Sequence, residues 1–293
     1  MRAIESGYAR LIQNLVAFAQ NEQEIRAVLM IGSRARTDHP ADEWSDLDLL
    51  VFATEPKKYV RSGDWVKQIG VPLLTFTEQT PGGDWERRTL FEGGLDVDFA
   101  ISSTQGLEYI AHNPFPADVV DLLRRGTRVL IDKDGLLALV QKQPLPPTVA
   151  KPPPGEAEFL NVVNDFWYHA LWTAKHLRRG ELWWSKSGLD MRLKELLRKM
   201  LEWHAQATHP AGFDTWLRGR FLEEWADPRA LAALPLVFAH YDTEDMARAL
   251  LATMDLFQWM EQETAKGFQY DGLTAGEQAV TQEVRELLAY NAG

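Results

Sequence analysis

The stretch Gly32-Ser33-Arg34, followed after a loop by Ser45-Asp46-Leu47-Asp48, is the most informative part of this chain. The Gly-Ser pair ends the apolar run 25–31, which is rich in β-branched residues and predicts a buried strand. Asp46 and Asp48 open a second apolar run, 46–52. Successive side chains of an extended strand alternate between its two faces, so both aspartates are expected on the same face.

Two carboxylates this close together repel each other unless a cation lies between them. Carboxylate oxygens suit Mg²⁺, which proteins usually hold with one or two carboxylates together with substrate phosphates. The turn formed by Gly32 and Ser33 offers backbone N–H groups and a hydroxyl to phosphate oxygens. Combined with Asp46 and Asp48, this turn predicts metal-assisted nucleotidyl transfer.

A third carboxylate is expected on a neighbouring strand, because Leu95-Asp96-Val97-Asp98-Phe99 repeats the same alternation. The pair Gly93-Gly94 separates the runs 88–91 and 95–101 and predicts a hairpin turn between two strands. Asp98 is followed by apolar residues, so we predict that it lies deeper in the sheet and completes the acidic site. Asp96 lies nearer the turn and is predicted to support the site or to contact the substrate.

The two halves of the chain have different patterns. A helix is expected over 6–20, with further strands over 71–77 and 128–131, whereas 143–155 is a proline-rich, extended segment. Beyond it, a loop-like segment is expected over 181–190, and helical periodicity covers 156–179, 189–207, 228–240, 243–266 and 275–290. We therefore predict an α+β protein: a nucleotidyltransferase domain with a mixed β-sheet and flanking helices over 1–142, a linker over 143–155, and an α-helical bundle over 156–293.

Composition excludes several functional classes. The chain has no cysteine, which excludes disulfides, thiolate metal sites and cysteine nucleophiles. Its net charge of −11 argues against a general nucleic-acid binder and is compatible with a cationic substrate. We find neither the pattern of a secretory signal nor an apolar run of membrane-spanning length, and we expect a cytoplasmic protein that is a monomer or a weak homodimer.

These motifs resemble the nucleotidyltransferase superfamily that includes DNA polymerase β, and within it most closely the aminoglycoside 6-adenylyltransferases. The family pattern of Gly-Ser-Arg, Asp-x-Asp and Phe-Glu-x-Gly-x-x-x-Asp stands here at 32–34, 46–48 and 91–98. The resemblance continues beyond the linker in Asn164-Asp165-Phe166-Trp167 and in the run 197–204, and it covers nearly the whole chain.

The resemblance implies a chemistry. AMP would be transferred from ATP, the co-substrate, with release of pyrophosphate. Two Mg²⁺ ions would be held by the catalytic aspartates Asp46, Asp48 and Asp98. Two roles are open for Asp98, which is either the general base as well or a metal ligand alone. This arrangement corresponds to a two-metal site, in which the ions stabilise the attacking and the leaving oxygens.

The resemblance also implies ligands for the nucleotide. Gly32 and Ser33 would hold the β- and γ-phosphates, and Lys175 would reach the triphosphate from the helical half. Two roles are open for Arg34, which either pairs with the phosphates or anchors the loop through a salt bridge.

The implied acceptor is a small cationic molecule, an aminoglycoside, and most specifically the 6-hydroxyl of streptomycin. The candidate substrate-binding residues are Glu92, Asp96, Asp165, Trp172 and Asp190. Asp165 and Trp172 are seven residues apart and share a helix face, which suits a guanidinium-bearing sugar. Ser187 stands where related sequences tend to carry an acidic residue.

Two alternatives remain open at the level of the sequence. The acceptor could be another aminoglycoside, a lincosamide or a metabolite with a free hydroxyl. The chain could instead be a non-catalytic nucleotide-binding regulator, although the complete set Asp46, Asp48 and Asp98 argues against a protein without catalysis.

Overall fold

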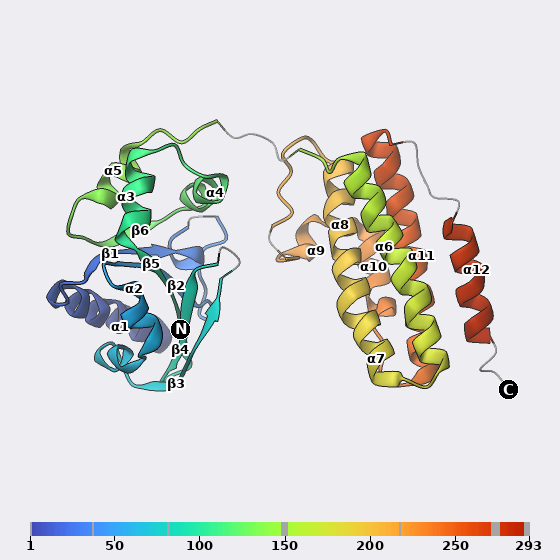
Figure 1. The fold of residues 1–293 in the computed structure, drawn as a ribbon, viewed down its shortest axis with the longest axis horizontal. Helices are drawn as coiled ribbons and strands as arrows, with labels where there is room; N and C mark the ends of the chain where they lie inside the picture. The colour runs from blue at the N-terminus through green and yellow to red at the C-terminus, as the bar shows by residue number, and fades with distance from the viewer. Residues whose placement is uncertain are drawn as a thin grey trace. The chain divides into compact units, whose positions relative to one another are not determined.

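The computed structural model describes residues 2–36, 38–80, 83–147, 152–216, 218–270 and 276–289. It divides the chain into two compact units, Met1–Pro147 and Thr148–Gly293 (Figure 1). The division falls within the proline-rich segment, of which residues 148–151 lie outside the described part. The predicted α+β class is confirmed, since the first unit holds a mixed sheet with flanking helices and the second is helical.

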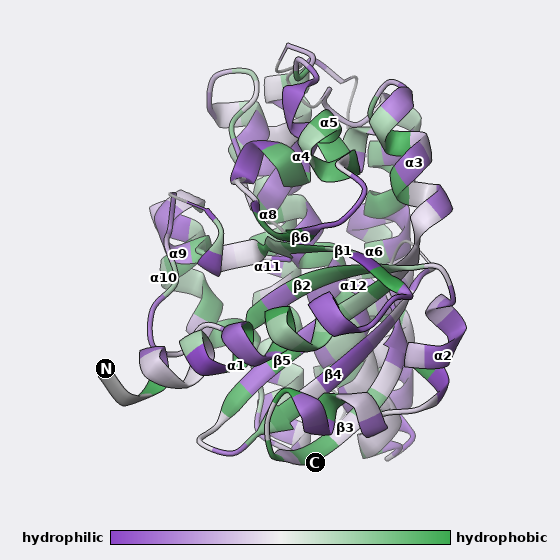
Figure 2. Ribbon diagram, turned by 90° about the vertical axis from the view of Figure 1, so that its left-hand side faces the viewer, coloured by the Kyte–Doolittle hydropathy of each residue, from purple (hydrophilic) through white to green (hydrophobic). Residues whose placement is uncertain are grey.

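The first unit is built on a six-stranded sheet with the order β3-β4-β5-β2-β1-β6. Only β2 and β5 run parallel, and all other neighbouring strands are antiparallel. Strands β1 and β2 are coloured as hydrophobic along most of their length (Figure 2). The strands are β1 (Ile25–Ile31), β2 (Leu47–Ala53), β3 (Pro72–Gln79), β4 (Trp85–Phe91), β5 (Leu95–Ser103) and β6 (Arg128–Asp132).

Helices cover the two faces of this sheet unequally. One face packs on α1 (Arg2–Asn21), α2 (Pro56–Arg61) and the 3₁₀ turn η2 (Asp64–Gln68), with fully buried side chains from β1, β2 and β5 between them. The other face has a smaller core formed by β1 and β2 with α3 (Thr104–His112), α4 (Ala117–Arg125) and α5 (Leu136–Lys142). That smaller core includes no residue of β3, β4 or β5 in the described part of the chain, so this part of the second face is left open.

Two glycines form the predicted hairpin between β4 and β5. Gly93 and Gly94 both have positive φ, +86° and +72°, a conformation that side-chain-bearing residues rarely adopt. The turn therefore needs glycine at both positions, and it sets the register in which Arg88 pairs with Asp98.

The second unit is a helical bundle in which α6 (Glu156–Arg178), α8 (Lys194–Thr208) and α11 (Thr243–Phe268) form the core. Phe166 of α6 and Phe257 of α11 stack face to face, with ring centroids 3.6 Å apart. The remaining helices are α7 (Leu182–Ser187), the π-helix η3 (Gly188–Leu193), α9 (Leu222–Trp225), α10 (Pro228–Val237) and α12 (Gly276–Ala289). Residues 275 and 290, the ends of the last predicted helix, lie outside the described part.

The prediction of a loop over 181–190 is wrong. This segment forms α7 and η3, which lead without a break into α8. At Gly188 a Cβ would approach Trp172 to 2.6 Å, so the glycine allows close helix packing. No helix in the described part of the chain is long and apolar enough to cross a membrane.

Candidate active site

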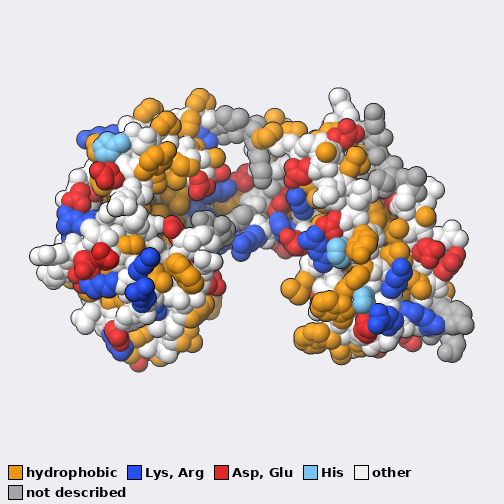
Figure 3. Space-filling model, in the orientation of Figure 1, with side chains coloured by type: hydrophobic (Ala, Val, Ile, Leu, Met, Phe, Trp, Pro, Cys, Tyr) orange, Lys and Arg blue, Asp and Glu red, His pale blue; other side chains and the backbone are white. Residues whose placement is uncertain are grey.

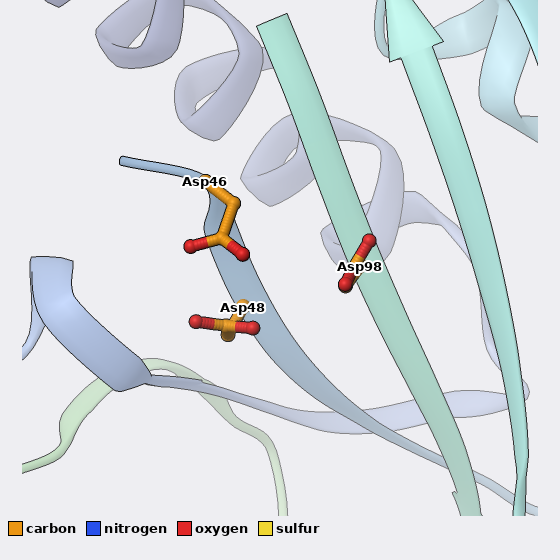
Figure 4. A group of neighbouring side chains, drawn as sticks. All are labelled: Asp46, Asp48 and Asp98. Carbon is orange, nitrogen blue, oxygen red and sulfur yellow. The ribbon is translucent and has the colours of Figure 1, made fainter. Parts of the chain in front are cut away.

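Three aspartates lie close together at the neighbouring parallel strands β2 and β5. Asp46 directly precedes β2, Asp48 lies within it, and Asp98 is the register partner of Asp48 on β5. One carboxylate oxygen from each residue lies within 4.8 Å of the others, and all three side chains are partly buried (Figure 4). The alternation of β2 produces this arrangement, because Leu47 and Leu49 fill the opposite, fully buried face.

The predicted glycine turn lies directly against this acidic site. β1 ends at Ile31, and Gly32 begins the 3₁₀ turn η1 (Gly32–Arg34) with φ of +70°. A Cβ on Gly32 would lie 1.9 Å from Oδ2 of Asp48, so no other residue fits without displacing the carboxylate. Glycine is therefore required here both by the backbone conformation and by the close approach of Asp48.

Ser33 is buried, and its Oγ has no hydrogen-bond partner in the structure. A buried hydroxyl without a partner is unfavourable, by about 1–3 kcal/mol, unless a ligand or water satisfies it. Ser33 also lines a cavity of about 500 Å³ whose wall carries Arg34, Arg36 and Arg128, together with the single carboxylate of Glu5. The turn thus combines a free hydroxyl with nearby positive charge, which suits an anionic group such as phosphate.

Arg34 anchors the loop that carries Asp46. Its Nε donates to the carbonyl of Asp46 at 3.0 Å, and its terminal nitrogen donates to the carbonyl of Ser45 at 2.8 Å. The guanidinium also pairs with Glu5 at 3.2 Å and lies 3.7 Å from the ring centroid of Tyr8. Of the two roles that the sequence left open, this geometry favours the anchor.

Sequence reasoning missed two charged residues of β4 beside Asp98. Arg88 is the register partner of Asp98, and its Nε lies 3.5 Å from Oδ2 of that residue. Burial and the neighbouring Glu86 carboxyl raise the pKa of Asp98 to about 7, Asp48 adds to this, and Arg88 opposes it. Glu86 and Arg88 are two residues apart, so the sequence places them on the same face of β4. Only the register between β4 and β5 shows that this face is the one that carries Asp98.

The donor set fits a divalent magnesium-type cation. Three carboxylates can each offer an oxygen to a common point, and hard cations such as Mg²⁺ bind carboxylate and phosphate oxygens. A cation bound at this point would favour the ionised form of all three carboxylates.

Asp96 and Glu92, predicted as substrate contacts, do not join the three aspartates. Asp96 accepts a hydrogen bond from the hydroxyl of Tyr8 on α1 at 2.9 Å. Together with burial, this contact raises the pKa of Tyr8 to about 12. Glu92 lies in the hairpin turn beside a separate cavity of about 470 Å³, which α1 also lines.

The candidate residues of the second unit lie on α6 and η3. Asp165 pairs with Nδ1 of His169 at 2.7 Å and with Arg192 of η3. Asp190 of η3 pairs with Lys186, and its Oδ1 is buried without a hydrogen-bond partner. The packing of η3 on α6 therefore brings two of the predicted acids to the same pair of elements.

Aromatic side chains surround these acids. Trp172 packs against the rings of His176 and Trp184, at 4.1 and 5.5 Å between centroids. Exposed large apolar side chains gather at this end of the bundle, where Figure 3 shows them beside histidines. The exposed large apolar side chains of α6, α7 and η3 are Tyr168, Trp183, Trp184 and Met191. Lys175 of α6 is exposed and forms no ion pair with any described residue.

Comparisons with known proteins show a family to which this chain is similar. The family model described as streptomycin adenylyltransferase matches residues 6–287. The chain is 23% identical to the aminoglycoside 6-adenylyltransferase of Bacillus subtilis (strain 168) over 261 residues, 86% of this chain and 88% of the relative. It is also 23% identical to the protein of the same name from Campylobacter jejuni, covering 86% of each chain. The crystal structure of an aminoglycoside 6-adenyltransferase from Bacillus subtilis aligns with 94% of this chain and 97% of that chain, at 17% identity and a TM-score of 0.45.

Proposed function

Because the chain belongs to the streptomycin adenylyltransferase family of nucleotidyltransferases, we propose that it transfers AMP from ATP to a hydroxyl of an aminoglycoside. We propose the 6-hydroxyl of streptomycin as the acceptor position and pyrophosphate as the second product. The observation that carries this proposal is the convergence of Asp46, Asp48 and Asp98 beside the Gly32-Ser33 turn.

In this proposal, Asp46, Asp48 and Asp98 hold two Mg²⁺ ions. Bound Mg²⁺ would neutralise the phosphate charge and make the attacking hydroxyl more acidic. Each carboxylate has two oxygens, so a residue that gives one oxygen to a cation keeps the other for hydrogen bonding. A rigid sheet edge is a suitable support, because the register of β2 and β5 fixes the separation of Asp48 and Asp98.

The chain's own groups would handle the phosphates and the proton. Ser33 Oγ and the backbone of the turn would donate hydrogen bonds to the β- and γ-phosphates, and Lys175 would add a point charge to the triphosphate. Asp98 would accept the proton of the acceptor hydroxyl while the oxygen of that hydroxyl forms a bond to the α-phosphorus. The bond from that phosphorus to the bridging oxygen breaks, and pyrophosphate leaves.

The acceptor assignment is supported by charge and by ring surfaces. A chain with a net charge of −11 attracts cationic ligands. Asp165 and Asp190 supply carboxylates, and Trp172 supplies an aromatic face. We propose that these three residues contact the acceptor.

Pyrophosphate release from ATP and Mg²⁺ across a panel of aminoglycosides and lincosamides tests the function. We expect release that depends on streptomycin and on the metal. Asp46→Asn and Asp48→Asn should abolish it, whereas Asp118→Asn, an exposed acid of α4, should leave it unchanged. Activity with a lincosamide and none with streptomycin would overturn the acceptor assignment. Full activity in Asp48→Asn would overturn the metal assignment.

A further inference from the structure

Arg88 is surrounded by three carboxylates on the open part of the sheet. Its Nε lies 2.7 Å from Oε1 of Glu86, 2.9 Å from Oε1 of Glu78 and 3.5 Å from Oδ2 of Asp98. The strand register explains the grouping, since Arg88 pairs with Asp98 on one side and Glu78 pairs with Glu86 in the next row. One guanidinium therefore lies beside three carboxylates, and all of these side chains share a face of the sheet with Asp48.

The distances divide these carboxylates into two classes. The two glutamates are within hydrogen-bonding distance of Arg88, whereas Asp98 is at the longer range of a loose ion pair. Glu86 is only 15% exposed and also contacts Asp98, so it lies within reach of the acidic site. A hard cation accepts any nearby carboxylate oxygen, so Glu86 would compete with the three aspartates if nothing else held it.

We propose that Arg88 is a positioning residue that holds Glu86 and Glu78 away from the metal and so reserves Asp98 as the single β4–β5 carboxylate available to it. This inference rests on the proposed function only in so far as Asp46, Asp48 and Asp98 bind a divalent cation. The planar guanidinium suits this task, because it can engage two carboxylates in a fixed geometry. Arg88 itself need not touch nucleotide or acceptor.

Mn²⁺ binding to the full chain without ATP tests the proposal, by electron paramagnetic resonance or calorimetry. In Arg88→Met we expect Mn²⁺ to bind about tenfold more tightly, because a nearby positive charge is lost and Glu86 is released toward the cation. Arg61→Met, which removes an exposed arginine of α2, is the control and should change nothing. In the same Arg88→Met protein we expect kcat to fall, since Asp98 is no longer reserved.

A double-mutant cycle separates this role from a simple loss of charge. With Arg88 present, Glu86→Gln should leave Mn²⁺ affinity within about twofold, because Glu86 is already held away. In the Arg88→Met background, Glu86→Gln should remove most of the gain. Equal effects of Glu86→Gln in both backgrounds, or weaker Mn²⁺ binding in Arg88→Met, would overturn the proposal. The Glu86→Gln single variant keeps it testable if Arg88→Met does not fold.

The readout distinguishes this inference from the proposed function. Mn²⁺ binding with the expected cycle, but no AMP transfer to any acceptor, would overturn the proposed function alone. Absence of Mn²⁺ binding to the unmodified chain would overturn the inference together with the metal site. AMP transfer together with additive effects of Arg88→Met and Glu86→Gln on Mn²⁺ affinity would support the proposed function and contradict the role of Arg88.

Discussion

At the scale of single residues, the site depends on two neighbouring positions of the turn after β1, Gly32 and Ser33. Gly32 has no room for a Cβ because Oδ2 of Asp48 occupies that position. Ser33 keeps a buried hydroxyl without a protein partner. The unpartnered hydroxyl of Ser33 costs stability in the free protein, and a ligand that accepts its hydrogen bond would remove that cost. Both features could be foreseen only in part, because sequence shows which residues form the turn but not what lies 2 Å from it.

Gly32→Ala tests the close approach. The new Cβ would push the Asp48 carboxylate away, so we expect AMP transfer to fall at least about a hundredfold, since small displacements at a reacting centre cost that much. Gly135→Ala is a matched control, because Gly135 has nearly the same φ, +72°, and open space at its Cβ. The control should lose only about 1 kcal/mol of unfolding free energy and keep its activity. Comparable activity in the two variants would contradict the role given to Gly32.

Asp98→Asn tests the proposed base. The amide keeps the size of the side chain but neither holds a cation well nor accepts a proton. We expect kcat to fall by about 10²–10⁴-fold, the usual contribution of acid–base catalysis. ATP binding, measured by calorimetry with Mg²⁺, should remain detectable because Asp46 and Asp48 are intact. Near-normal turnover would rule out Asp98 as the base.

At the scale of elements, strands and helices differ in how far the sequence predicted them. Strand β1 matches its prediction over 25–31, and β2 and β5 match within two residues, because their alternating or continuous apolar patterns are strong. The grouping of Glu78, Glu86 and Arg88 around Asp98 could not be predicted, since one sequence does not give the register of β3, β4 and β5. Helix α7 (Leu182–Ser187) was missed, because a helix of 6 residues is too short to show a helical period in the sequence.

The contact of α12 with the bundle contains a buried carboxyl pair. Glu261 of α11 is fully buried and Glu277 of α12 nearly so, and the two carboxyls are close enough to raise the pKa of Glu261. Trp167 donates to Oε2 of Glu261 at 3.0 Å, and Gln258 donates to Glu277. Burial and the Glu277 carboxyl raise the pKa of Glu261 to about 9. The native state thus binds a proton that the unfolded chain releases near pH 4.5.

This pair predicts a direction for the pH dependence of stability. A carboxyl whose pKa is raised in the native state stabilises it fully below the unfolded value, and that contribution is lost as the pH rises toward about 9. We therefore expect the melting temperature to fall between pH 5 and pH 9. Glu261→Gln, which keeps an acceptor for Trp167, should flatten this dependence, whereas Glu283→Gln, an exposed acid of α12, should not. An unchanged pH profile in Glu261→Gln would contradict the shared proton.

At the scale of the whole molecule, the two units carry different kinds of chemistry. The first holds the three aspartates and the glycine turn, which suit a metal and phosphates. The second holds exposed tryptophans and tyrosines beside partnered acids, which suit a cationic sugar. The family assignment unites these halves, because its model spans both units at residues 6–287. The proposed acceptor leaves the weakest trace in sequence, since the residues proposed to contact it lie on two separate elements, α6 and η3.

This division of chemistry predicts that the kinetic effects of substitutions separate by unit. Trp172→Leu and Asp190→Asn should raise the KM for the acceptor by about tenfold, because losing one ring or charge contact costs near 1.4 kcal/mol. Mn²⁺ binding and the KM for ATP should stay unchanged, because neither side chain belongs to the unit that holds the aspartates. Asp48→Asn should do the reverse, abolishing Mn²⁺ binding while aminoglycoside binding, measured by calorimetry, persists.

The control in the second unit is Glu283→Gln, which should leave both constants unchanged. If Trp172→Leu raised the KM for ATP as much as that for the acceptor, the assignment of the helical unit to acceptor recognition would be wrong.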